Sequence, residues 1–369
     1  MEIVRRHKTI DPHGSRVCPR GPRPKAGTAG NEAKPLRLRK YWVWLLVASL
    51  CLSLAIPFLL GGIGQFELLD RLSWLAMGSF IFLVAVSWAF NSLRTQMLMR
   101  ATGRGVSFPN AALVTISAEF AGVSTPGSVG MPATYTFLFH NLGVRVGEAI
   151  GLVGLIMVTD LIFYGAMMPL AAVVQVFEAG TKHNSFLLAG EVVVVVGGTI
   201  LALWALVRHY RAVYHFVSRQ MGKIRWLAKY RYRLARATVQ FIHSLRLVER
   251  QSWAWRGGLF LVTVGFWLPR YLIMALAIYL VGAAVPLSYL FLVQGALNLG
   301  GQVLMTPGGA GTVGAGYAAF LSPYLGGQSL GFSLLMWRFF TFYWLLIVGG
   351  PIFLLKTGKA AHDLLTKKS

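Results

Sequence analysis

Long apolar stretches separated by short polar segments make up most of this 369-residue chain. Stretches of about 20 apolar residues are long enough to cross about 30 Å of hydrocarbon as helices. Six predicted spans meet this requirement, at residues 41–60, 72–92, 149–177, 186–207, 257–281 and 332–355. Two further apolar stretches, 110–139 and 286–321, are divided into arms of about 10–14 residues, and each arm is too short to span alone.

The two divided stretches are interrupted by the same frame, Thr-Pro-Gly-x-x-Gly. It starts at Thr125 and again at Thr306. Pro lacks a backbone donor and Gly costs backbone entropy, so both residues break helices. Irregular backbone at membrane depth persists only where protein or a water-filled cavity covers it. Matching breaks in two halves are typical of a transporter site at a repeat interface, whereas ordinary loops outside the membrane are the alternative.

Charge favours the first interpretation. The chain is 56% hydrophobic with a net charge of +23, and its basic residues flank the apolar spans rather than forming a nucleic-acid surface. If both divided stretches are hairpins that return to the side they entered, every strongly basic segment is cytoplasmic. If the first crossed once, residues 208–256, with twelve basic residues against one acid, would lie outside. The sequence therefore predicts six transmembrane helices and two oppositely oriented re-entrant hairpins in an all-α inverted repeat.

The predicted organisation has three parts. Residues 1–40 are Pro-, Gly- and Arg-rich and are expected to form a disordered cytoplasmic tail. Residues 41–355 form the transmembrane domain, with repeats at about 41–178 and 186–355, and residues 356–369 form a cytoplasmic tail. Within the second repeat, a helical apolar stripe through the basic segment 208–256 favours amphipathic helices that contact anionic lipids on the inner leaflet.

Several function classes find no support in the sequence. Two cysteines, Cys18 and Cys51, form no disulfide framework, and the eight histidines lack the spacing of metal ligands. No Ser-His-Asp set, catalytic carboxylate pair or P-loop is recognisable. We therefore predict no cofactor, no metal and no enzymatic activity, and no nucleic-acid partner.

Four ionisable residues fall at membrane depth: Glu119, Asp160, Arg270 and Arg338. Each is costly in hydrocarbon and is expected to face the protein interior or a cavity. Asp160 and Arg270 lie at similar heights, roughly 16 and 20 Å from the inner edge of their spans, and we expect them to be partners. Such a pair either locks the helices together or belongs to a polar cavity that binds a charged lipid head group.

The broken helices add uncharged donors to this group. Free amides and the dipole at a half-helix end favour an anion such as phosphate. The predicted substrate-binding residues are Glu119, Thr125, Gly127, Ser128, Asp160, Arg270, Gln302, Thr306, Gly308, Gly309 and Arg338. The alternative for each uncharged side chain is an ordinary helix-packing role.

These motifs, taken together, resemble a known family. The first frame is followed by Asn141-Leu142-Gly143-Val144 and Glu148-Ala149, and then come Asp160, Arg270, the second frame and Arg338. Over residues 41–355 this resembles the lysylphosphatidylglycerol synthase transmembrane region family, whose members are often described as flippase-like. The resemblance implies a protein of the bacterial inner membrane that moves a phospholipid or lipid-linked head group between leaflets, and the charge distribution predicts that both termini are cytoplasmic. An aminoacyl-transfer domain follows the membrane part in the synthases, and we expect its activity to be absent here.

Two functional hypotheses follow. The first is a lipid flippase or transporter that works without ATP hydrolysis, with the two hairpins forming the head-group site. The second is a non-catalytic membrane scaffold subunit of an envelope lipid or glycan synthesis machinery. The sequence leaves open whether the protein forms a homo-oligomer.

Overall fold

The computed structural model describes residues 51, 53–179, 197, 251–303, 309 and 311–366, all within one compact unit that spans Val43–Ser369. The described residues contain helices and turns but no strand, which confirms the predicted all-α class. The predicted tail 1–40, the span 186–207 apart from residue 197, and nearly all of the basic segment 208–256 lie outside the described residues.

Four of the described helical segments are long and apolar enough to cross a membrane, with mean hydropathies from 1.6 to 2.0. They are α2 (Trp74–Ala101), α5 (Val146–Ala179), α10 (Trp253–Leu280) and the continuous run of α13 (Gly327–Arg338), the π-helical turn η2 (Phe339–Tyr343) and α14 (Trp344–Thr366). These four segments coincide with four of the six predicted spans. Before α2, a helical segment through residues 53–61 leads into the 3₁₀ helix η1 (Ile63–Arg71).

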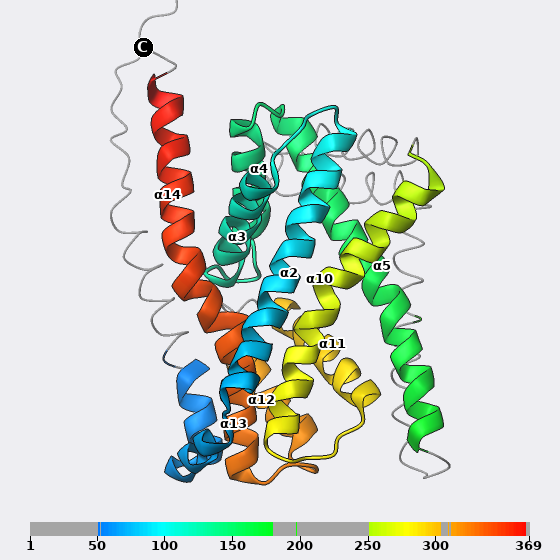
Figure 1. Ribbon diagram of the computed structural model, residues 1–369, viewed down its shortest axis with the longest axis vertical. Coiled ribbons are helices and arrows are strands. Elements are labelled where there is room, and N and C mark those ends of the chain that lie inside the picture. The colour runs from blue at the N-terminus through cyan, green and yellow to red at the C-terminus, as the bar shows by residue number, and fades with distance from the viewer. Residues whose placement is uncertain are drawn as a thin grey trace, which may run out of the picture. The chain divides into compact units, whose positions relative to one another are not determined.

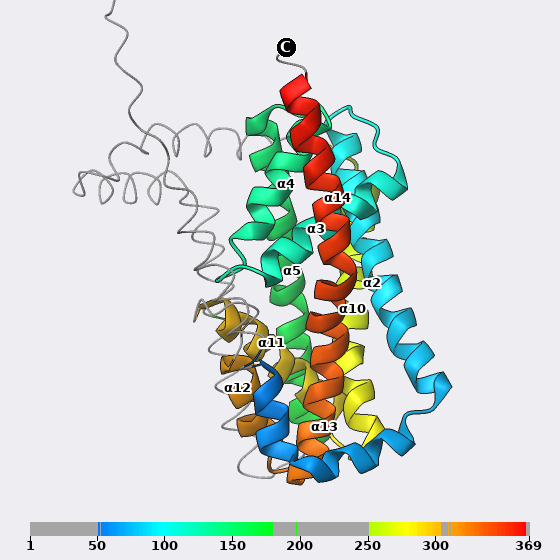
Figure 2. The same ribbon diagram turned by 90° about the vertical axis from the view of Figure 1, so that its left-hand side faces the viewer.

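Shorter helices form two pairs, and each pair contains one of the repeated frames. The first pair is α3 (Phe108–Val123) and α4 (Gly130–Asn141), and the second is α11 (Leu287–Val303) and α12 (Thr312–Leu321). Figures 1 and 2 place α3 and α4 in the upper half of the view and α11 and α12 in the lower half. The pairs therefore occupy opposite ends of the long helices, which is the arrangement an inverted repeat predicts.

Local chemistry explains the break between α3 and α4. The Thr125 hydroxyl donates to the Ala121 carbonyl at the end of α3 and accepts from the Gly130 amide at the start of α4, both at 2.8 Å. Between them, Gly127 and Ser128 have φ of 59° and 56°, in the left-handed region that an α-helix cannot contain. Gly309, at the same frame position as Ser128, has φ of 66°. The two frames thus share a left-handed residue at their fourth position, whereas their sixth residues differ, since Gly311 has φ of 82° and Gly130 begins α4.

The end of α2 differs from the prediction. The sequence analysis placed the end of this span at residue 92. The helix instead continues to Ala101, and Arg94 is 1% exposed. The reason is that Arg94 forms an ion pair with Asp160 of α5, so that its charge is compensated inside the protein.

One close backbone contact fixes α13 against the segment before η1. A Cβ added at Gly331 would lie 2.6 Å from the Gly61 backbone and from the Pro57 carbonyl. Neither neighbour is a side chain that could rotate away. The approach of these two helices therefore depends on the missing side chain at residue 331.

We expect Gly331→Ala to lower the free energy of unfolding by about 1–3 kcal/mol, the usual cost of overpacking. The measurement is the melting temperature of the purified protein in detergent. Gly78→Ala on α2 is the control, since a Cβ there meets nothing within 4 Å and Ala favours a helix over Gly by about 1 kcal/mol. Equal melting temperatures for the two variants would show that this contact does not determine helix position.

Candidate functional site

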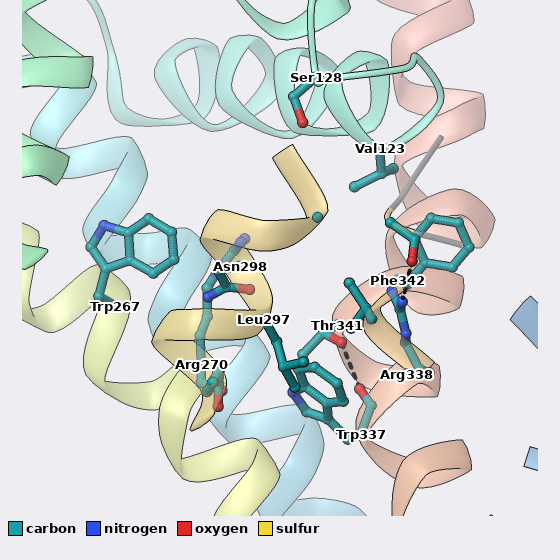
Figure 3. Close-up of a pocket in the computed structure, with 15 residues that line it drawn as sticks. Val123, Ser128, Trp267, Arg270, Leu297, Asn298, Trp337, Arg338, Thr341 and Phe342 are labelled. Carbon is teal, nitrogen blue, oxygen red and sulfur yellow. Dashed lines mark hydrogen bonds between the residues drawn. The ribbon is translucent and has the colours of Figure 1, made fainter. Parts of the chain in front are cut away.

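A cavity of about 210 Å³ lies where the two helix pairs meet α10 and α13 (Figure 3). Both frames contribute to it, through Gly127 and Ser128 from the first and Gly309 from the second. The rest of the described lining is Val123, Trp267, Arg270, Gln294, Leu297, Asn298, Gly301, Val313, Trp337, Arg338, Thr341 and Phe342. The two frames, far apart in the sequence, therefore form one site.

Arg338 forms one wall of the cavity, at the last residue of α13. Its Nη2 donates to the Gly309 carbonyl at 3.2 Å, which connects the α13 end to the second frame (Figure 3). The guanidinium lies 5.6 Å from the ring centres of both Trp337 and Phe342. The helix widens into the π-helical turn η2 directly after Arg338, and such turns are frequent at functional sites.

Arg270 of α10 lies across the cavity from Arg338 (Figure 3). Its Nη2 donates to Glu119 Oε2 of α3 at 2.5 Å, and its Nε donates to the Ser87 hydroxyl of α2 at 3.0 Å. The Phe266 ring lies 4.5 Å from the guanidinium and adds a cation–π contact. Arg270 therefore connects the cavity to α2 and α3.

A second ion pair lies behind the first. Arg94 of α2 pairs with Asp160 of α5, and Asp160 also accepts from the Trp267 indole at 2.8 Å. Asn91 joins the two pairs, because its Nδ2 donates to Glu119 at 2.5 Å and its Oδ1 accepts from Arg94 at 2.8 Å. Two acids and two bases are thus neutralised in one network, as burial inside the protein requires.

The structure brings together most of the predicted site residues that it describes. Gly127, Ser128, Arg270, Gly309 and Arg338 line the cavity. Three others contact residues of the lining or of the first turn. Glu119 accepts from Arg270, Asp160 accepts from Trp267, and the Thr125 hydroxyl accepts from the Gly130 amide across the turn. Thr306, Gly308 and the side chain of Gln302 lie outside the described residues.

The expected partnership of Asp160 with Arg270 is wrong. Asp160 pairs with Arg94, and Arg270 pairs with Glu119. Sequence reasoning missed Arg94, Asn91 and the lining residues Trp267 and Gln294. A signal for Arg94 was present, because the apolar residues Met97, Leu98 and Met99 follow it and continue the helix.

The pairing predicts which double substitutions restore stability. Glu119→Leu or Arg270→Leu alone leaves a buried charge without its partner, at a cost of about 3–5 kcal/mol in soluble proteins. The double variant Glu119→Leu/Arg270→Leu removes both charges and is expected to melt above either single variant. Glu119→Leu/Asp160→Leu also has two substitutions but leaves both Arg94 and Arg270 without their acids, and it is expected to melt lowest.

The measurement is again the melting temperature in detergent. Arg145→Leu is the control, since the Arg145–Glu148 pair has an 84% exposed arginine side chain and such pairs contribute about 0–1 kcal/mol. If the two double variants melted at the same temperature, the identity of the partners would not matter and the network would be refuted.

Comparison with known proteins identifies the family of this chain. The family model for the lysylphosphatidylglycerol synthase TM region matches residues 43–349, which include both helix pairs, both frames and all described residues of the two ion pairs. The chain is also similar to a UPF0104 membrane protein from Archaeoglobus fulgidus, with 21% identity over 283 residues, covering 75% of this chain and 85% of that protein. The helical architecture, the apolar spans and the match over most of the chain agree, and the protein belongs to the lysylphosphatidylglycerol synthase transmembrane region family of membrane proteins.

Proposed function

We propose that this protein is a lipid transporter of the flippase type, which moves a phospholipid or lipid-linked head group across the bacterial inner membrane. One observation carries the proposal. Adjacent residues of the first frame line a polar cavity and an apolar groove, since Ser128 lines the cavity and Val129 lines the groove. A polar site with an apolar groove beside the same turn suits a molecule with a charged head and an acyl chain.

The polar part suits an anionic head group. Arg270 and Arg338 bring two guanidinium groups to the cavity, and the described lining contains no carboxylate. Trp267, Trp337 and Phe342 surround the remaining space with aromatic rings (Figure 3). Guanidinium groups bind phosphate through charge-assisted hydrogen bonds, which strengthen where water is excluded.

The apolar part suits an acyl chain. The groove has a volume of about 570 Å³ and lies between α4 and the start of α5, lined by Val129, Pro132, Ala133, Thr136, Phe137, His140, Val146, Ile150 and Val153. Its two polar side chains bond within the protein, with the Thr136 hydroxyl donating to the Pro132 carbonyl at 2.8 Å and His140 Nδ1 lying 3.0 Å from the Val144 carbonyl. The groove therefore offers hydrocarbon a surface with few competing polar groups.

The proposed membrane topology has six transmembrane helices, with α3–α4 re-entering from the cytoplasm and α11–α12 from the outside. Both termini are then cytoplasmic, as the positive-inside rule favours. Convergence of the two frame turns on one cavity supports this topology, because inverted repeats place their broken helices at a shared midplane site. Basic cytoplasmic segments would contact anionic lipids.

The ion pair at Arg270 suggests how the head group enters and leaves. Glu119 occupies one side of the guanidinium, so an incoming phosphate would compete with or share its hydrogen bonds. Release of the head group would return Arg270 to Glu119 without leaving a buried charge unpaired. Neither step requires ATP hydrolysis or covalent chemistry, and we therefore propose a transporter rather than an enzyme.

Filling the groove tests this proposal. Ala133→Trp places an indole in the groove, and we expect it to slow lipid translocation about tenfold, from a packing penalty of about 1–3 kcal/mol on the bound acyl chain. The assay is bleaching by dithionite of a fluorescent phospholipid in proteoliposomes, which reports movement between leaflets. Ala85→Trp is the matched control, since Ala85 is exposed on α2 and lines neither the cavity nor the groove.

Translocation by the wild-type protein and by Ala85→Trp, together with its loss in Ala133→Trp, would support the proposal. If the wild-type protein moved no lipid above protein-free vesicles, the scaffold function would be favoured instead. Equal rates for all three proteins would place the acyl chain elsewhere.

A further inference from the structure

Glu119 is a buried acid whose basic partner is open to the cavity. Its carboxylate accepts from Arg270 and from Asn91, each at 2.5 Å, and its side chain is 6% exposed. The Arg270 side chain is 25% exposed and lines the cavity, whereas Arg94, the partner of Asp160, is 2% exposed and lies outside the described lining. An anion in the cavity can therefore reach the partner of Glu119 but not the partner of Asp160.

We propose that Glu119 is a proton-binding site, which takes up one proton when an anion binds Arg270 and releases it when the anion leaves. The proposal rests on the proposed function, since the anion is the head group that this cavity would hold. It concerns the coupling of that anion to a proton, and movement of a lipid between leaflets does not by itself imply such coupling.

An anion beside Arg270 removes the compensation of the Glu119 charge. One guanidinium then faces two negative groups inside the protein, and like charges at short range and low dielectric favour the protonated form of a carboxyl group. Arg270 cannot supply the proton, because a guanidinium stays charged in proteins. The proton therefore comes from water. Arginine with a carboxylate becomes arginine with an anion and a neutral acid, and the net charge of the site is unchanged.

The hydrogen bonds around Glu119 suit both protonation states. Asn91 donates to Oε1, and a protonated carboxyl group keeps that acceptor. Oε2, which accepts from Arg270 in this structure, would carry the proton and donate it to the anion. The Asn91 side chain is itself fixed, because its Oδ1 accepts from Arg94 at 2.8 Å. The acid can thus change its charge without leaving a polar atom unpaired.

The charged and titratable groups that face Glu119 come from three helices, α2, α4 and α10. They are Arg94, Tyr135 and Arg270. From α14, the charged side chain that the structure describes is Lys356, which bonds to Asn110 at the start of α3, nine residues or about 14 Å of helix before Glu119. Arg94 is held by Asp160 of α5, so compensation of the Glu119 charge depends on Arg270.

Buried hydroxyl groups extend the polar surroundings of Glu119 toward the loop between α2 and α3. Thr115 lies one turn before Glu119 on α3, and its hydroxyl is 3.1 Å from that of Thr95 on α2. The Tyr135 hydroxyl of α4 faces both threonines, and all three residues are at most 1% exposed. Hydroxyl groups both donate and accept, so they can carry a proton about one helical turn toward the side that the proposed topology makes cytoplasmic.

The test is the number of protons taken up when an anion binds the full-length protein in detergent. The probe is dioctanoyl phosphatidylglycerol, a phosphodiester that stays singly charged near neutral pH. Titration calorimetry in PIPES and in Tris gives the proton number, because these buffers differ in ionisation enthalpy. We expect about one proton per lipid for the wild-type protein. Kd is then expected to rise about tenfold per pH unit wherever the free acid is ionised and the bound acid is protonated.

A substitution assigns the proton to Glu119. Glu119→Gln keeps a neutral side chain of the same shape, and we expect it to bind the lipid without proton uptake and with a Kd that does not depend on pH. Glu67→Gln is the matched control, since Glu67 is an exposed acid on η1, and it should keep the wild-type proton number. Melting temperatures near that of the wild type establish that the variants fold.

Infrared difference spectra of the wild-type protein test the proposal without any variant. Lipid binding is expected to convert one carboxylate band into a carboxylic acid band, and the absence of that change would overturn the proposal. A wild-type proton number near zero, or full proton uptake by Glu119→Gln, would also overturn it. Loss of uptake in Asp160→Asn but not in Glu119→Gln would place the proton on the other acid, with the same consequence.

The inference and the proposed function fail in different ways. Translocation in vesicles, combined with lipid binding that takes up no proton, would refute this inference and leave the proposed function intact. Proton uptake on binding without translocation would support this inference and refute the proposed function.

Discussion

Compensation of charge away from water is the constraint on which the interior of this protein depends. Two acids and two arginines lie on four different helices, α2, α3, α5 and α10, and each acid is bonded to an arginine. Breaking either pair would leave a buried or half-buried charge without its partner. The helices must therefore hold each acid beside its arginine. Asn91 bonds to Glu119 of one pair and to Arg94 of the other, so a shift that disturbs one pair also disturbs the other.

The same constraint shapes the cavity. Arg270 takes part in the network and also lines the cavity, whereas Trp267 lines the cavity and donates to Asp160. The same residues thus line the polar site and connect the helices to one another. A ligand at Arg270 would exchange bonds with Glu119, and the effect would reach α2 and α3 through groups already in contact.

The sequence predicted the helical class, four spans that the structure describes and the two breaks, because apolar length and Pro-Gly frames are local signals. It also identified Arg270 and Arg338 as cavity residues, since an arginine within a long apolar run has few other roles. It failed at Arg94 and at the pairing of Asp160, because which charges meet depends on how helices rotate and pack. Asn91 was missed for the same reason, since nothing in its sequence neighbourhood marks a side chain that bonds to two ion pairs.

The two frame turns also use different residue types at the one position where both are left-handed. Both place their fourth residue in the left-handed region, but that residue is Ser128 in the first turn and Gly309 in the second. A side chain makes this conformation costly in the folded state, by roughly 1–2 kcal/mol, whereas glycine pays mainly in entropy when the chain becomes ordered. The two turns are therefore unequal in free energy at this position, although both residues are left-handed. The first turn thus holds backbone strain at Ser128 that its neighbours must offset, and Gly309 adds none of this kind.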